Sequence, residues 1–152
     1  MNLDVGRKES KMHIFIFQSV PERYDLRNEL KRGRTDTWYA TRYRSQMSPG
    51  DYVFFWMGGD ENVRGLYGWG VLKSSAYIKP NWDTFGVDVE YKVRFKRPIL
   101  ARYVKSDVTL NNLLIFKAPS ASNFLLDEKE ARQLLSLVEK FGEEVPNAGG
   151  QL

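Results

Sequence analysis

The sequence predicts an α+β fold, in which a curved, barrel-like and mostly antiparallel β-sheet has helices packed at its edges. Short apolar runs rich in aromatic residues recur along the chain and are bounded by glycine, proline or polar clusters, as is typical of strands. Helical patterns are few and lie beside these runs, so strands dominate. At 152 residues with 42% hydrophobic content, the chain is long enough for one domain with a substantial core.

The first predicted elements are a strand and a short helix. Residues 12–18 alternate two sets of apolar side chains, which predicts a strand buried on both faces. A helix over residues 22–31 should follow, with Pro21 in its first turn and Gly33 as its stop. Trp38 then lies in a segment with no strand pattern, so we expect it in a loop.

Two adjacent strands are predicted in the middle of the chain. Residues 49–50 are Pro-Gly, the pair that suits the two corners of a type II turn. The aromatic run 52–57 then reads as a strand buried on both faces, and residues 65–72 should return antiparallel to it. Gly68 and Gly70 leave one face of the return strand bare, which permits a bulge or the close approach of another backbone. Trp56 and Trp69 lie within these strands and are expected to pack in the core.

The later part of the chain holds one clear strand and one ambiguous segment. Residues 74–85 are expected to form a loop. Apolar and charged residues alternate over 87–95, which predicts a strand with one buried face, ended by Pro98. Residues 110–116 are compatible with either a short helix or a buried strand, because their periodicity does not decide between them.

A helix closes the predicted domain. Asp127 and Glu130 have the spacing of a capping box, and Gly142 should end the helix. Its apolar face comprises Ala131, Leu134, Leu135, Val138 and Phe141. We expect residues 12–142 to form the domain, residues 1–11 to be a flexible leader and residues 143–152 to be a flexible tail.

Charge is unevenly distributed along the chain. Residues 1–126 carry 20 basic and 13 acidic side chains, a net charge of +7, whereas residues 127–152 carry 3 and 6, a net charge of −3. A basic body is expected of a protein that binds a polyanion, although a solvated surface would give the same composition. There is no run of ~18 apolar residues for a membrane span and no apolar signal core after Met1. We therefore expect no membrane partner and a cytoplasmic location, and we favour a monomer.

The residues that most enzymes need are sparse. The chain has no cysteine, and His13 is its only histidine, on a predicted strand where a structural role is favoured. No serine has the strand-turn-helix setting of a hydrolase nucleophile, and Gly65, Gly68 and Gly70 have the wrong order for a dinucleotide fingerprint. We therefore expect no catalysis, no metal site and no cofactor.

The ordered motifs resemble those of the EVE domain family, a member of the PUA-like superfamily related to the YTH readers of modified RNA. The resemblance begins with Trp38 ahead of basic residues and continues with the run 49–56 (PGDYVFFW) and the run 65–71 (GLYGWGV). It extends over nearly the whole chain through residues 13–18, 91–99 and 115–124. It implies a PUA-like fold and a reader of modified bases, such as methylated or hydroxymethylated ones, in a bacterial or archaeal restriction setting or in RNA modification.

The resemblance also implies where a flipped base would bind. It places one wall of an aromatic cage at Trp38 and a second in the loop that contains Trp82; from the sequence alone Trp82 could equally be a plug on the core. We expect Tyr39 beside Trp38, and Ser19, Tyr24 and Asn81 as contacts to the base edge. Asn123 is either a further edge contact or a turn residue.

Basic residues near these positions are candidate phosphate contacts, namely Arg42, Arg44 and Lys79. Aromatic rings near arginines suit a flipped base, because stacking on one ring is worth about 1–3 kcal/mol and extrusion costs a few kcal/mol. The expected partner is therefore DNA or RNA with a modified base. The alternative is a protein-interaction module whose cage binds a methylated lysine or another cation, but arginines beside Trp38 disfavour it. From its place outside a strand, we expect Trp38→Ala to leave the domain folded.

Overall fold

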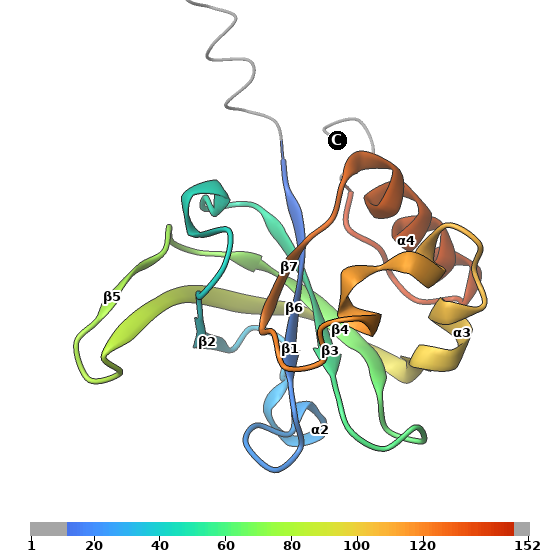
Figure 1. Cartoon of the computed structure of the whole chain (residues 1–152), viewed down its shortest axis with the longest axis horizontal. Coiled ribbons are helices and arrows are strands. Elements are labelled where there is room, and N and C mark those ends of the chain that lie inside the picture. The colour runs from blue at the N-terminus through green and yellow to red at the C-terminus, as the bar shows by residue number, and fades with distance from the viewer. Residues whose placement is uncertain (1–11, 148–152) are drawn as a thin grey trace, which may run out of the picture.

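Seven strands join into one curled sheet in the computed structural model, which describes residues 12–147 (Figure 1). The strands are β1 (Ile14–Ser19), β2 (Thr35–Tyr39), β3 (Tyr52–Met57), β4 (Gly65–Leu72), β5 (Tyr77–Lys79), β6 (Thr84–Leu100) and β7 (Asn123–Leu125). Their order is β2-β6-β4-β3-β1-β7, with β5 paired to β6. Only β1 and β3 pair in parallel, so the mostly antiparallel half-barrel confirms the predicted fold class.

Short helices lie around the sheet. They are α2 (Leu26–Glu29), α3 (Ala101–Lys105) and α4 (Glu128–Lys140), with the 3₁₀ turns η1 (Arg44–Gln46), η2 (Leu110–Asn112) and η3 (Leu114–Phe116). Figure 1 shows α3 and α4 together at one side of the sheet, while the β5–β6 hairpin projects at the opposite side. Residues 110–116 form two 3₁₀ turns separated by Leu113 and no strand, which resolves the ambiguity left by their periodicity.

The sheet separates two apolar clusters because successive side chains of a strand point to opposite faces. Ile14 and Ile16 join the cluster covered by α4, together with Trp56 and Trp69. The other cluster receives the alternate residues of each strand: Phe15, Phe17, Phe55, Tyr91 and Trp38. Trp56 and Trp69 are both buried, so their predicted place in the core is confirmed.

The glycines of β4 allow its close contact with β6. A Cβ atom on Gly70 would lie 2.2 Å from the carbonyl oxygen of Glu90, and one on Gly68 would lie 2.2 Å from that of Val93. Register shifts occur next to both glycines. The predicted bulge and the predicted backbone approach are thus both present.

The predicted helix over residues 22–31 was wrong in length. The described helix α2 has four residues, because Asp25 caps it and the preceding residues turn instead, with the N–H groups of Arg23 and Tyr24 donating to Val20. Gly33, at φ +82°, lies beyond the helix and donates its N–H to Tyr91 on β6. The chain therefore reaches β6 at once and continues alongside it.

Two predicted loops contain strands. Trp38 lies in β2, which pairs with β6 in the register Trp38↔Val87. Residues 77–79 form β5, which folds back on the start of β6 and leaves Trp82 in the turn. Neither segment has enough apolar alternation to be recognised, because only the long partner strand β6 makes them strands.

Pro98 does not end a strand, contrary to the prediction. Strand β6 continues to Leu100, and its pairing with β4 jumps from Gly68↔Arg94 to Leu66↔Ile99. Pro98 falls within this irregularity, where its missing N–H removes no ladder hydrogen bond. The carboxylate of Glu143 accepts from the N–H groups of Lys96 and Arg97 in the same segment.

The final helix begins as predicted and differs in its apolar face. Both hydrogen bonds of the Asp127–Glu130 capping box are present, and Gly142 follows the helix at φ +80°. Leu137 is buried where Leu135 was expected, and Phe141 is 42% exposed at the end of the helix. Residues 1–11 and 148–152, which hold the predicted leader and half of the predicted tail, lie outside the described residues.

Candidate functional site

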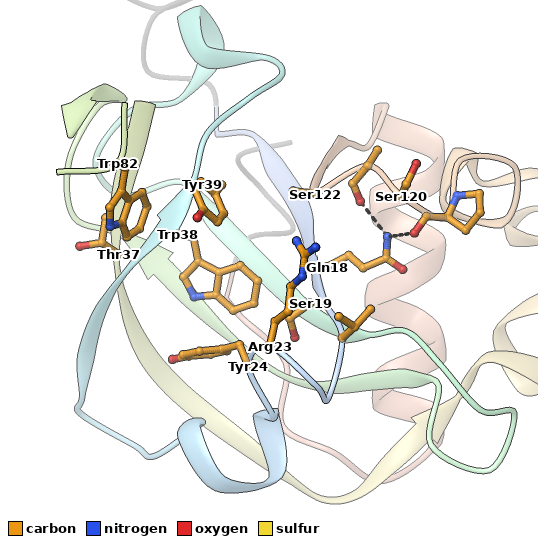
Figure 2. Close-up of a pocket in the computed structure, with 13 residues that line it drawn as sticks. Gln18, Ser19, Arg23, Tyr24, Thr37, Trp38, Tyr39, Trp82, Ser120 and Ser122 are labelled. Atoms are coloured by element: carbon orange, nitrogen blue, oxygen red, sulfur yellow. Dashed lines mark hydrogen bonds between the residues drawn. The ribbon is translucent and has the colours of Figure 1, made fainter. Parts of the chain in front are cut away.

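A cavity of about 560 Å³ opens where β1 and β2 end, between the β5–β6 turn and the loop before β7 (Figure 2). Five residues predicted for the site line it: Ser19, Tyr24, Trp38, Tyr39 and Trp82. Its other lining residues are Gln18, Val20, Arg23, Thr37, Pro119, Ser120, Ala121 and Ser122. Segments from both halves of the chain thus meet around one hollow.

Trp38 packs in the core and also lines the cavity. Only 7% of it is exposed, and its ring packs against Phe17 and Phe55, with centroids 6.0 and 5.2 Å away. Tyr24 meets it edge-on at 5.3 Å. The indole therefore has a fixed position in the cavity wall, and its place in a strand explains the burial that the loop prediction missed.

A directed chain of hydrogen bonds holds the aromatic wall. Trp38 Nε1 donates to the hydroxyl of Tyr91 at 2.9 Å, and that hydroxyl lies 2.5 Å from the hydroxyl of Tyr24. Tyr24 donates to Asp36, which also accepts from Arg34 at 3.2 Å. The indole can only donate, so the Tyr91 hydroxyl accepts from Trp38. The carboxylate can only accept, so the Tyr24 proton points to Asp36, and the proton of Tyr91 must then point to the Tyr24 oxygen.

The pKa values of the two tyrosines in this chain are both raised. Burial is the main cause for both, and the bond to Asp36 adds to the effect on the pKa of Tyr24. The pKa of Tyr91 rises to about 12. Both hydroxyls keep their protons at neutral pH, so Tyr24 contributes its ring and an acceptor oxygen to the cavity but no free donor.

Tyr39 and Trp82 form an aromatic pair at the rim. Their ring centroids are 4.6 Å apart and the rings are tilted by 45°. A base held between two rings needs them about 7 Å apart, since stacked carbon atoms lie about 3.5 Å from each other. The pair therefore leaves no slot between its members and offers an outer face instead. Half of Tyr39 is exposed, and Lys79 Nζ lies 5.6 Å from the Trp82 ring.

The Ser19 hydroxyl is a buried polar atom with no hydrogen-bond partner among the described residues. Ser19 ends β1, and the next residue begins the turn that leads to α2. A hydroxyl can donate and accept, whereas leaving it unpaired and buried costs free energy. Because Ser19 lines the cavity, its unpaired hydroxyl is a candidate partner for a ligand.

The opposite wall is the loop of residues 119–122, which the Gln18 side chain holds in place. Gln18 Nε2 donates to the carbonyl oxygens of Pro119 and Ala121 at 3.1 and 2.7 Å, shown by the dashed lines in Figure 2. The Gln18 backbone N–H donates to Ser122 at 2.8 Å. No local pattern distinguishes Gln18, because its hydrogen-bond partners lie about a hundred residues away.

Two predicted edge contacts do not line the cavity. Asn123 is fully buried behind the wall, where its Oδ1 accepts from the Thr41 N–H at 2.8 Å and its Nδ2 donates to the Tyr39 carbonyl at 2.9 Å. It fixes the chain that follows Trp38. Asn81 is exposed in the turn before Trp82.

The predicted phosphate contacts lie outside the cavity on their own aromatic neighbours. The guanidinium of Arg44 stacks over Phe85 at 4.2 Å, and that of Arg42 lies 5.6 Å from the ring of Tyr43. Lys79 lies on Trp82 as described above. Arg23, which lines the cavity, is not among the predicted contacts, because it falls within the predicted helix over residues 22–31.

The cavity lining contains one charged residue, Arg23, and neither aspartate nor glutamate. Among residues 12–147, no group of three or more histidine, cysteine, aspartate or glutamate residues could hold a metal ion. None of the described helices is long and apolar enough to span a membrane. The cavity can therefore bind a ligand by stacking, by hydrogen bonds to neutral groups and by one cation.

A family model described as the EVE domain matches residues 13–137. No curated protein matches the chain. Among solved structures, a hypothetical protein from Leishmania major is 20% identical, with 87% of this chain and 98% of that chain covered and a TM-score of 0.68.

Two other similar structures contain nucleic acid. Human THYN1 protein in complex with 5-methylcytosine-containing DNA is 22% identical, with 84% of this chain and 98% of that chain covered and a TM-score of 0.65. The YTH domain of Zygosaccharomyces rouxii MRB1 protein, in complex with N6-methyladenosine RNA, is 14% identical, with 90% of each chain covered and a TM-score of 0.53. These likenesses establish the fold that the two share with this chain.

Proposed function

The chain belongs to the EVE domain family, and from this premise we propose that it is a non-catalytic reader that binds DNA or RNA with a modified base flipped into the cavity. The observation that carries this proposal is the lining itself: aromatic side chains beside an unpartnered buried hydroxyl and one arginine. A flipped base needs stacking faces, an edge contact and a charge for its phosphates. The complexes of THYN1 and of the YTH domain with modified nucleic acid support the same class of ligand.

The roles follow from the positions. The Trp38 and Tyr24 rings form the wall against which the base would lie, and the Ser19 hydroxyl would pair with its edge. Tyr39 and Trp82 would stack on the exposed side of the base or on its neighbour. Lys79 lies 5.6 Å from the ring of the rim residue Trp82, and Arg42 and Arg44 follow Tyr39 closely in the chain, so these three cations would meet the phosphates of flanking nucleotides.

A methylated-lysine cage is the weaker alternative. A cage for a quaternary cation gains from carboxylates, and a neighbouring cation opposes it. The lining has no carboxylate and includes Arg23. The same groups favour an anionic or neutral ligand.

The proposal is tested by titrating the protein with duplex DNA containing one 5-methylcytosine, with RNA containing one N6-methyladenosine, with their unmodified counterparts and with a trimethyllysine peptide. We expect one modified oligonucleotide to bind more tightly than its unmodified counterpart. Equal affinities within every pair, or binding of the peptide alone, would overturn the proposal.

The variant Trp82→Ala separates stacking from folding. It removes a ring at the rim and should weaken the preferred oligonucleotide by about ten- to a hundredfold, the value of one lost stacking face. Ile78→Ala is the matched control, since Ile78 lies on the same hairpin and is 67% exposed. The control should bind as the wild type does.

A further inference from the structure

We propose that Arg23 binds a phosphate group of the flipped nucleotide at the mouth of the cavity. This assignment rests on the proposed function and adds a subsite to it: one phosphate bound by the same cavity that takes the base. It separates Arg23 from Arg42 and Arg44, which lie outside the lining.

The backbone around Arg23 is fixed, so its side chain starts from a defined place. The N–H groups of Arg23 and Tyr24 both donate to the Val20 carbonyl, at 3.0 and 2.9 Å. This turn puts Arg23 between two other lining residues, Ser19 and Tyr24. Figure 2 shows the Arg23 side chain between Trp38 and Gln18, which belong to opposite walls of the cavity.

Arg23 has a free guanidinium where its neighbours do not. Arg27 is held by Asp25 at 2.7 Å, and Arg34 by Glu29 at 2.6 Å. No ion pair or hydrogen bond within residues 12–147 involves the Arg23 side chain, and it is exposed. Asp25 and Glu29 are therefore paired with other arginines, and the Arg23 guanidinium can bind an external anion.

The chemistry of the lining selects phosphate as that anion. When a base enters a cavity, the phosphates on either side of its sugar stay at the mouth. A guanidinium presents a planar fork of donors that matches two phosphate oxygens. Every other polar group in the lining is neutral, so Arg23 is the one lining residue that can form an ion pair with a phosphate.

The test combines a protein change with a ligand change. Arg23→Gln removes the charge, and Arg27→Gln four residues further along is the matched control whose charge is already paired. Each protein is titrated with the 5-methylcytosine DNA and the N6-methyladenosine RNA, with normal linkages or with neutral methylphosphonates on both sides of the modified base.

We expect Arg23→Gln to weaken binding of the normal oligonucleotide by about tenfold or more, the value of a charge-assisted bond. Neutral linkages should weaken the wild type and Arg27→Gln to a similar degree and have little further effect on Arg23→Gln, because the same contact is then lost twice. Unchanged affinity in Arg23→Gln, or an equal effect of neutral linkages on all three proteins, would overturn the assignment.

The two levels of proposal fail differently. If the wild type does not prefer any modified oligonucleotide, the reader function fails and the phosphate subsite fails with it. If the preference is present and Arg23→Gln behaves as Arg27→Gln does, only the subsite is wrong. Thermal midpoints of both variants should stay near that of the wild type, because neither side chain is buried.

Discussion

At the scale of single residues, some side chains of the site stabilise the fold and others are available only for binding. Trp38 is buried and hydrogen-bonded, so Trp38→Ala should cost about 3–5 kcal/mol of folding stability, as for other core tryptophans. That variant cannot separate binding from folding, contrary to the expectation drawn from its predicted loop. Ser19 differs from Trp38, because its hydroxyl forms no hydrogen bond with the described residues and so does not stabilise the fold.

Ser19→Ala should therefore weaken binding without weakening the fold. Removing an unpaired buried hydroxyl relieves its desolvation cost, so the thermal midpoint should stay constant or rise. Affinity for the preferred modified oligonucleotide should fall by about five- to tenfold, the value of one hydrogen bond. Ser45→Ala, at an exposed serine outside the cavity, is the control. A lower midpoint with intact binding would show that the hydroxyl serves the fold.

The raised pKa of Tyr91 predicts a loss of stability in alkali. The pKa of a tyrosine is ordinarily about 10, and burial raises the pKa of Tyr91 to about 12. Below pH 10 both folded and unfolded chains keep the proton, and the stabilising effect is complete. Between pH 10 and 12 the unfolded chain loses a proton that the folded chain retains, so the free energy of unfolding falls by about 1.4 kcal/mol per pH unit for this residue.

Tyr91→Phe should make that fall shallower in urea unfolding measured between pH 8 and 12. At pH 7 it should also cost about 1–3 kcal/mol, because Trp38 Nε1 loses its acceptor. Tyr103→Phe, at a residue that is 45% exposed, should change neither quantity. An unchanged pH profile for Tyr91→Phe would mean that the buried Tyr91 hydroxyl does not control alkaline stability.

At the scale of elements, the contact between β4 and β6 depends on the absence of side chains. Gly70→Ala would put a Cβ atom 2.2 Å from a backbone carbonyl that cannot move without breaking the sheet. We expect the free energy of unfolding to fall by about 1–3 kcal/mol or more, as for other overpacked sites. Gly58→Ala is the comparison, because the nearest atom to its Cβ would be the side-chain oxygen of Gln18, at 3.2 Å, and not a backbone carbonyl. Equal losses in urea unfolding for the two variants would contradict this account of the sheet.

At the scale of the whole molecule, the positive charge of residues 1–126 should dominate affinity for nucleic acid. Log affinity should fall linearly with log salt concentration, with a slope of about −0.9 for each phosphate neutralised on duplex DNA. Arg42→Ala and Arg44→Ala should each reduce the slope by about one and weaken modified and plain oligonucleotides equally, since phosphate contacts contain no base information. A selective loss of discrimination in either variant would place that arginine on a base edge.

Much of the fold is determined by local sequence, because strong patterns leave few alternatives. The aromatic run 52–57, the glycine-marked return strand 65–72 and the alternating run over 87–95 all form strands where they were predicted. The capping box at Asp127 and the family resemblance also hold. The sequence likewise placed Ser19, Tyr24, Trp38, Tyr39 and Trp82 in one site, and all five line one cavity.

The strands and side-chain positions that depend on a partner far away in the chain were decided by the tertiary structure alone. Strands β2 and β5 exist because β6 continues far enough to pair with both, so their own sequences show no strand. The pairing of β2 with β6 makes Trp38 a core residue. Asn123 lies behind the cavity wall, where its side chain forms hydrogen bonds with backbone groups of Tyr39 and Thr41. Arg23 reached the cavity because a turn replaced the predicted helix. Pairing and turns of this kind join residues far apart in the chain, and periodicity within one segment cannot report them.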